Sequence, residues 1–261
     1  MAKYPAAIAH RGMSSLAPEN TMAAFAKCID HGVSAFEFDV DVLSDGSVIV
    51  IHDDTLDRTT SGSGGYYDLT FSDIRKLDAG KWFSTTYTFE RIPELVSVVE
   101  FINATSLEAN LEVKPSKSGP ELRNALIDGV IVSLGTLKDS NMILISSFDM
   151  DLLTSLKARA PQYRRATLFD YDPEQPIMSQ VAHWIEEATR LEATAIHPSN
   201  EGLTKEAVEA MVEAGFQVNV WTVNDLERAE ELASWGVHAV FTDIAQDFPV
   251  EAREAHPISE A

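Results

Sequence analysis

The chain alternates short runs of strand-forming residues with longer segments of helical period, and this alternation limits the possible folds more than any other feature. The strand candidates are residues 7–10, 35–40, 107–113, 142–147, 166–169, 194–197, 217–223 and 237–242. Helical candidates between them include residues 21–31, 204–214 and 226–235. Such alternation is typical of parallel sheets built from βα units. With about eight strands in 261 residues, it predicts a TIM (β/α)8 barrel.

One more strand-like run, residues 47–51, has to be left out of the barrel for this count to hold. Ser44-Asp45-Gly46 is a turn sequence between two apolar runs, so residues 38–43 and 47–51 are expected to pair as a hairpin. A crossover to a parallel strand would need about a dozen residues, which this turn does not have. The hairpin therefore brings His52 back beside Asp39.

Residues 54–92 are too long for an ordinary βα loop. They are rich in Thr, Ser, Gly, Asp and aromatic residues, and a short helix is expected at residues 71–77. We expect this segment to be a small insertion after the second strand, over the barrel mouth, so that residues 1–261 form one domain. The tail after Phe248 is polar and acidic and is expected to be loosely ordered.

The net charge of the chain limits the kinds of molecule that it can be expected to bind. The chain has 41 acidic and 20 basic residues, and its formal net charge of −21 argues against binding to nucleic acid or to an anionic membrane. An anionic substrate would need a local positive site, made by a metal ion or by a few Arg and Lys side chains.

The sequence also predicts a cytoplasmic protein without a membrane anchor. No apolar run approaches the roughly 18 to 20 residues of a membrane-spanning helix. The first residues have no signal-peptide pattern. Cys28 is the single cysteine and cannot form an internal disulfide, which suits a reducing compartment.

Acidic residues stand where the predicted strands end, which in a TIM barrel is the face of the active site. Glu37 and Asp39 are two residues apart on one strand, so their carboxylates point the same way. Together with Glu112 from the neighbouring strand, they form a set of oxygen ligands for one divalent cation, Mg²⁺ or Ca²⁺. The alternative is a buried ion-pair network in which the acids only pair with Arg11 and Lys114.

Two histidines are expected beside that cation, since His10 ends the first strand and His52 follows the hairpin. A histidine pair that flanks one phosphate can deprotonate a nucleophile and protonate a leaving alkoxide. Arg11 and Lys114 are candidate phosphate ligands, and Trp221 is a candidate to pack on the substrate. A structural role is the alternative for each of these side chains.

Three further residues need an interpretation. Glu19 either reaches the site or complements the N-terminal turn of the first helix, and the second role is favoured. Gly12 is expected to let the backbone approach the substrate closely. His197 either lines the pocket or packs in the core.

The order of these residues resembles that of the glycerophosphodiester phosphodiesterase family. The motifs are His10-Arg11-Gly12, Pro18-Glu19-Asn20-Thr21, Glu37-Phe38-Asp39-Val40, Asp45-Gly46, His52-Asp53, Leu56-Asp57-Arg58-Thr59-Thr60 and Glu112-Val113-Lys114, with a weaker likeness at residues 220–224 and 241–243. The resemblance implies a TIM barrel with a small insertion, one divalent cation, and hydrolysis of small-molecule glycerophosphodiesters to sn-glycerol 3-phosphate and an alcohol.

The resemblance also implies roles for single residues. His10 and His52 would be the general acid/base pair, and Arg11 and Lys114 would contact the phosphate. The metal ligands would be Glu37, Asp39 and Glu112.

Other activities stay open at this point. A lysophospholipase D-like enzyme would need apolar surface, which aromatic residues of the insertion can supply: Tyr66, Tyr67, Phe71, Trp82 and Phe83. A non-catalytic barrel that only binds phosphodiesters and a different metal-using barrel, such as an enolising enzyme, are further alternatives.

Overall fold

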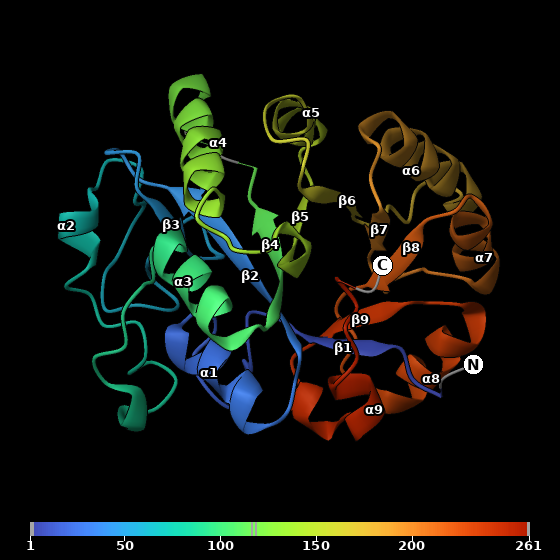
Figure 1. The fold of residues 1–261 in the computed structure, drawn as a ribbon, viewed down its shortest axis with the longest axis horizontal. Helices are drawn as coiled ribbons and strands as arrows, with labels where there is room; N and C mark the ends of the chain where they lie inside the picture. Colours follow the sequence, from blue (N-terminus) through green and yellow to red (C-terminus); the bar gives the residue numbers. More distant parts are fainter. Residues whose placement is uncertain (1–2, 116, 118, 260–261) are drawn as a thin grey trace.

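The computed structural model describes residues 3–115, 117 and 119–259. Within these residues, eight parallel strands form a closed barrel, because β1 pairs with both β2 and β9 (Figure 1). The strands are β1 (Ala6–Ala9), β2 (Ala35–Val42), β4 (Glu108–Val113), β5 (Ile143–Ser147), β6 (Arg164–Phe169), β7 (Ala195–Pro198), β8 (Gln217–Val220) and β9 (Ala239–Thr242). This confirms the predicted TIM barrel.

Helices follow the strands and form the outer layer (Figure 1). They are α1 (Met22–Asp30), α3 (Leu95–Thr105), α4 (Pro120–Leu134), α5 (Met150–Arg159), α6 (Ile177–Leu191), α7 (Lys205–Glu213), α8 (Leu226–Trp235) and α9 (Val250–Arg253), with short 3-10 helices η1 (Thr85–Tyr87), η2 (Ser140–Met142) and η3 (Ala245–Asp247). Thr21 caps α1, and Gly236, at φ 100°, ends α8. In the described part of the chain, no helix is both long and apolar enough to cross a membrane.

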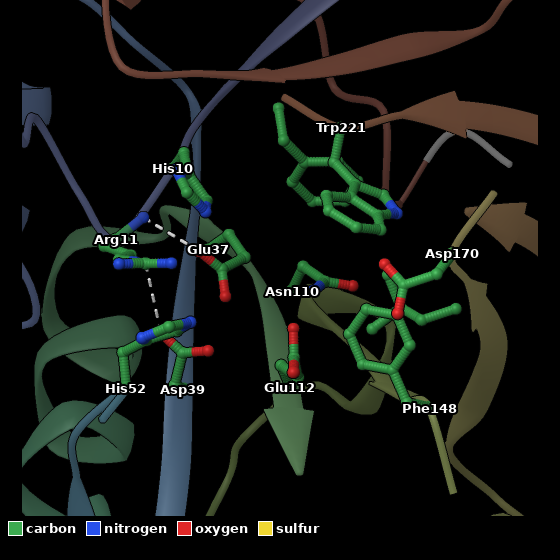
Figure 2. A pocket seen from close by; sticks show the side chains of 12 residues that line it. His10, Arg11, Glu37, Asp39, His52, Asn110, Glu112, Phe148, Asp170 and Trp221 are labelled. Atoms are coloured by element: carbon green, nitrogen blue, oxygen red, sulfur yellow. Dashed lines mark hydrogen bonds and ion pairs between the residues drawn. The ribbon is translucent and has the colours of Figure 1, made fainter. Parts of the chain in front are cut away.

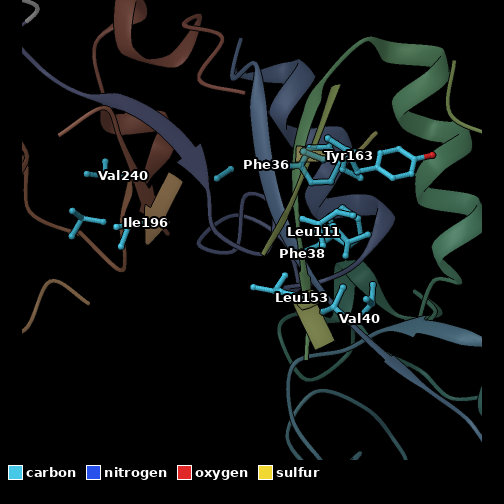
Figure 3. Packing of buried hydrophobic residues seen from close by; sticks show 14 of the residues in the cluster. Phe36, Phe38, Val40, Leu111, Leu153, Tyr163, Ile196 and Val240 are labelled. Atoms are coloured by element: carbon cyan, nitrogen blue, oxygen red, sulfur yellow. The ribbon is translucent and has the colours of Figure 1, made fainter. Parts of the chain in front are cut away.

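Strand β2 shows how the sequence places the site. Every residue of β2 is buried, as in strands covered on both faces. Phe36, Phe38 and Val40 point outward and pack in the core between the barrel and its helices (Figure 3). The Phe36 ring lies 4.6 Å from that of Phe25 on α1. Because side chains alternate along a strand, Glu37 is directed into the barrel.

Strand β3 (Val48–Val50) forms the expected hairpin with β2. Gly46 occupies the turn at φ 83°, a backbone conformation that favours glycine. The Ile51 nitrogen donates to the Asp39 carbonyl at 3.0 Å, so His52 follows directly beside Asp39. The hairpin confirms that this run stays outside the barrel.

The insertion packs against the hairpin through its own apolar cluster, in which Leu56, Tyr66 and Ile74 contact Leu43 and Ile49. Its helix α2 (Phe71–Ile74) is shorter than the predicted 71–77, because the chain turns after Ile74. Figure 1 shows α2 beside β3. We propose that residues 54–92 are part of the barrel domain.

The expectation of a loosely ordered tail is wrong for the described residues up to Ser259. The Ile258 side chain is 1% exposed and packs inside the barrel floor against Leu144 and Ala166. The nitrogens of Ile258 and Ser259 donate to the Glu108 carboxylate at 2.8 and 3.1 Å. A fully buried carboxylate needs such donors, and only the folded tail supplies them here among the described residues.

Replacing Ile258 with alanine should therefore lower the free energy of unfolding by about 2–4 kcal/mol, since it leaves a cavity at the barrel floor. Urea unfolding followed by circular dichroism measures this loss. The control is Val250→Ala on α9, where the side chain is half exposed and the change should stay within about 0.5 kcal/mol. Equal stability of the Ile258→Ala variant and the wild type would contradict a packed tail.

Candidate active site

A cavity of about 260 Å³ opens where the barrel strands end (Figure 2). Its lining includes most of the residues expected from the sequence: His10, Arg11, Glu37, Asp39, His52, Glu112 and Trp221. Sequence reasoning did not assign a role to four others: Asn110, Leu168, Asp170 and Phe241. Phe148, the remaining lining residue, makes an edge-to-face contact with Trp221 at 5.5 Å.

Three carboxylates meet on one side of this cavity. Glu37, Asp39 and Glu112 each offer an oxygen, and these oxygens all lie within 4.8 Å of one another. The parallel pairing of β2 with β4 sets Asp39 opposite Glu112. Burial raises the pKa of Glu37 well above its ordinary value, and the charge of Asp39 adds to this. Burial and Asp39 also raise the pKa of Glu112 to about 8.

Only part of this negative charge is offset by the protein. Burial alone would raise the pKa of Asp39, but Arg11, His52 and a hydrogen bond from Asn20 hold it below its ordinary value. The Arg11 Nε atom lies 3.5 Å from Asp39, and the Arg11 backbone nitrogen donates to Glu37 at 2.8 Å. The Glu112 carboxylate has no hydrogen bond or ion pair with any described residue. The ion-pair alternative thus accounts for Asp39 alone, and the donor set fits a divalent cation.

Each of the two histidines is held by a carboxylate. His10 Nδ1 lies 2.8 Å from Asp243, and His52 Nδ1 lies 2.7 Å from Asp53. Against the effect of burial, hydrogen bonds from His10, Asn224 and Ser14 lower the pKa of Asp243 to about 2. An ionised carboxylate only accepts, so Nδ1 carries the hydrogen. Nε2 of each ring then has no partner in the described structure, and both rings border the cavity (Figure 2).

A chain of ion pairs connects His52 to Arg11. Arg58, from the insertion, donates to Asp53 at 2.7 Å and to Glu19 at 2.6 and 2.7 Å. Glu19 in turn accepts from Arg11 at 2.9 Å. Thr21, and not Glu19, caps α1, and two arginines bind the Glu19 carboxylate.

The structure also places three other residues that were considered for the site: Gly12, Lys114 and His197. Gly12 is not among the residues that line the cavity, and a Cβ there would lie 2.8 Å from Ala24, so the glycine permits close packing of α1. Lys114 lies outside the cavity, in a neighbouring hollow, and donates to the His52 carbonyl. His197 is fully buried beside Asn219, which favours its core interpretation.

The position of Trp221 depends on the His197 backbone, whose carbonyl accepts from the indole Nε1 at 3.0 Å. Burial lowers the pKa of the His197 imidazole to about 3, so this ring stays neutral. Trp221 is thereby fixed as a wall of the cavity.

Comparison with known proteins agrees with this geometry. The model of the glycerophosphoryl diester phosphodiesterase family matches residues 10–246. The chain belongs to this family. A glycerophosphodiester phosphodiesterase of Caldanaerobacter subterraneus subsp. tengcongensis is 36% identical over 236 residues, which cover 90% of this chain and 93% of that protein. Another from Bacillus altitudinis is 30% identical, with coverage of 94% and 97%.

A solved structure is also similar to this chain. It is an Oleispira antarctica phosphodiesterase in complex with the product sn-glycerol-3-phosphate, with a TM-score of 0.84 and 32% identity. The match covers 93% of this chain and 94% of that one. These findings confirm the resemblance seen in the motifs and the enzyme class that the family description names, a phosphoric diester hydrolase.

Replacing Glu19 with glutamine should lower the free energy of unfolding by about 1–3 kcal/mol, since Arg11 loses one of its two anionic partners in a largely buried place. Despite burial, Arg58 and Arg11 lower the pKa of Glu19. Such a carboxylate stabilises the fold above its unfolded pKa, so the difference from the wild type should shrink as the pH falls below about 4.5.

Urea unfolding at neutral and acid pH measures this difference. The control is Glu100→Gln, an exposed residue of α3, which should change the stability by less than about 0.5 kcal/mol. A pH-independent difference for Glu19→Gln would show that packing, and not charge, is lost.

Proposed function

We propose that this chain hydrolyses glycerophosphodiesters to sn-glycerol 3-phosphate and an alcohol, and that it needs a divalent cation to do so. The observation that carries the proposal is the meeting of two carboxylate-held histidines with three clustered carboxylates in one cavity. Membership of the glycerophosphoryl diester phosphodiesterase family supports it, as does the product found in the Oleispira antarctica relative.

Glu37, Asp39 and Glu112 would hold the cation, Mg²⁺ or Ca²⁺. When bound, the cation supplies positive charge for the phosphoryl oxygens, which matters in a protein with a net charge of −21. Arg11 adds a fixed positive charge at the same end of the cavity. Lys114 contributes a positive charge from the neighbouring hollow.

His10 and His52 would move the protons. In the neutral ring, Nε2 has a lone pair that can accept the proton of an attacking hydroxyl or water, while the second ring, in its charged form, donates to the leaving alkoxide. Asp243 and Asp53 fix the orientation of the rings. This is the arrangement that a displacement at phosphorus requires, with one proton acceptor and one proton donor.

The five aromatic residues considered from the sequence give little support to a substrate with an acyl chain. Of the five aromatic residues that would provide apolar surface in the insertion, only Trp82 is exposed. Tyr66 is buried, and its hydroxyl donates to Asp41 at 2.7 Å. A small-molecule diester therefore suits this site better. A cytoplasmic location and the absence of nucleic-acid binding stay predictions from the sequence.

The purified protein should release glycerol 3-phosphate from glycerophosphocholine in the presence of Mg²⁺ or Ca²⁺, and EDTA should abolish the release. His10→Ala and His52→Ala should each lower kcat by about 100-fold or more, because each loses one proton transfer. A coupled glycerol 3-phosphate assay measures both effects, with lysophosphatidylcholine as the alternative substrate.

The matched control is His183→Ala, an exposed histidine on α6, which should keep wild-type activity. Folded wild-type protein that releases nothing with either metal would overturn the proposed function. Faster release from lysophosphatidylcholine would favour the lysophospholipase D-like alternative.

Metal binding should also depend on pH. The pKa of Glu112 is raised from 4.5 to about 8 in the folded protein, so without metal its contribution to stability is full below about pH 4.5 and is lost as the pH rises to about 8. A cation replaces the proton. The increase in melting temperature caused by Mg²⁺ or Ca²⁺ should therefore grow between about pH 6 and pH 8.

Thermal unfolding with metal and with EDTA at both pH values tests this expectation. Glu112→Gln should reduce the metal-induced increase strongly, while Glu100→Gln should retain it. An increase of the same size at both pH values would argue against a site made of protonated carboxyls.

A further inference from the structure

The cavity offers two hydrogen-bond acceptors that the protein leaves unused, one beside the three carboxylates and one across from Arg11. Asn110 lies on β4, two residues before Glu112, and its side chain is 1% exposed. Its amide nitrogen donates to Ser146 at 2.9 Å, whereas its Oδ1 has no partner among the described residues. A buried amide oxygen of this kind needs a donor, and the cavity that Asn110 lines is the place for one.

Asp170 supplies a second acceptor. It follows β6 and lines the same cavity, and Figure 2 shows its carboxylate directed inward, across the cavity from Arg11. No hydrogen bond or ion pair joins Asp170 to any other described residue. The edge-to-face pair of Trp221 and Phe148 lines the same cavity, so the cavity also offers apolar ring surface.

These two ends of the cavity suit different parts of one substrate. Arg11 and a cation on the three carboxylates attract a phosphoryl group, whereas the charge of Asp170 repels it. A group beside Asp170 and Asn110 has to donate hydrogen bonds. Hydroxyl groups on a short carbon chain do so, and their CH groups can pack on the rings of Trp221 and Phe148.

A trimethylammonium group fits this end less well. It would satisfy the charge of Asp170 and the aromatic rings. It has no hydrogen to donate, however, so it would leave Asn110 Oδ1 buried and unpaired. The combination of an amide oxygen and a carboxylate therefore favours a hydrogen-bond donor, such as a polyol, over a trimethylammonium group.

We propose that Asp170, with Asn110 as the second acceptor, binds the free hydroxyl groups of the glycerol arm and thereby selects glycerol-containing diesters. This inference rests on the proposed function, and it assigns the glycerol arm to the Trp221 side of the cavity. Asp170 is then a specificity-determining residue. The alcohol that leaves needs no contact with it.

The test compares glycerophosphocholine with the phosphocholine ester of propane-1,2-diol, which lacks the terminal hydroxyl. The wild type should prefer glycerophosphocholine in kcat/KM by about 10-fold or more. Asp170→Ala should lower kcat/KM for glycerophosphocholine by about 10-fold and change that for the analogue by less than about threefold, so that the preference disappears. Asn110→Ala should reduce the preference in the same direction.

Glu201→Ala is the matched control, because Glu201 is an exposed acid close enough to affect the pKa of Asp170 but lies outside the cavity lining. It should leave both rates unchanged, and thermal unfolding should show that Asp170→Ala is folded. Glycerophosphoglycerol should lose as much activity as glycerophosphocholine in the Asp170→Ala variant.

An equal loss on glycerophosphocholine and on its deoxy analogue would overturn the inference, as would a loss restricted to diesters with an ammonium group. In both cases the wild type would still release glycerol 3-phosphate, so the proposed function would stand. A wild type that releases none would overturn the proposed function and this inference together.

Discussion

The mutual repulsion of three carboxylates inside the barrel is the constraint on which the rest of the site depends. Strand geometry forces it, because Glu37 and Asp39 point the same way and Glu112 lies opposite on β4. Burial makes each of these charges unfavourable in free energy, because a buried carboxylate loses its contact with water. Asn20 and Arg11 stabilise the charge of Asp39. The negative charge that the protein does not offset, on Glu37 and Glu112, defines a place for a cation.

The offsetting charges reach well beyond this cluster. Arg11 needs Glu19, Glu19 also binds Arg58, and Arg58 binds the Asp53 that orients His52. Since Arg58 belongs to the insertion, the insertion does more than cover a hairpin. It completes the electrostatic surroundings of one histidine, so the geometry of His52 and the folding of residues 54–92 are coupled.

The sequence predicted what depends on local pattern. The strands, the hairpin turn at Gly46 and the inward direction of Glu37 follow from periodicity and turn chemistry, which neighbouring residues determine. Contacts between distant segments could not be predicted from the sequence. The partner of His10 is 233 residues away, and the donors to Glu108 come from the tail. No local pattern distinguishes these polar residues from ordinary surface ones. The close packing of α1 against Gly12 has the same origin.

These distant contacts form because the barrel closes, which brings the two ends of the chain together. The His10 nitrogen donates to the Thr242 carbonyl at 3.0 Å, and His10 Nδ1 meets Asp243, so the end of β1 is completed by the end of β9. On the opposite face, the tail after β9 fills the barrel floor around Glu108. The last strand and the tail thus hold both ends of the barrel. Because His10 acquires its carboxylate only when β9 is paired with β1, the site exists only in the closed barrel.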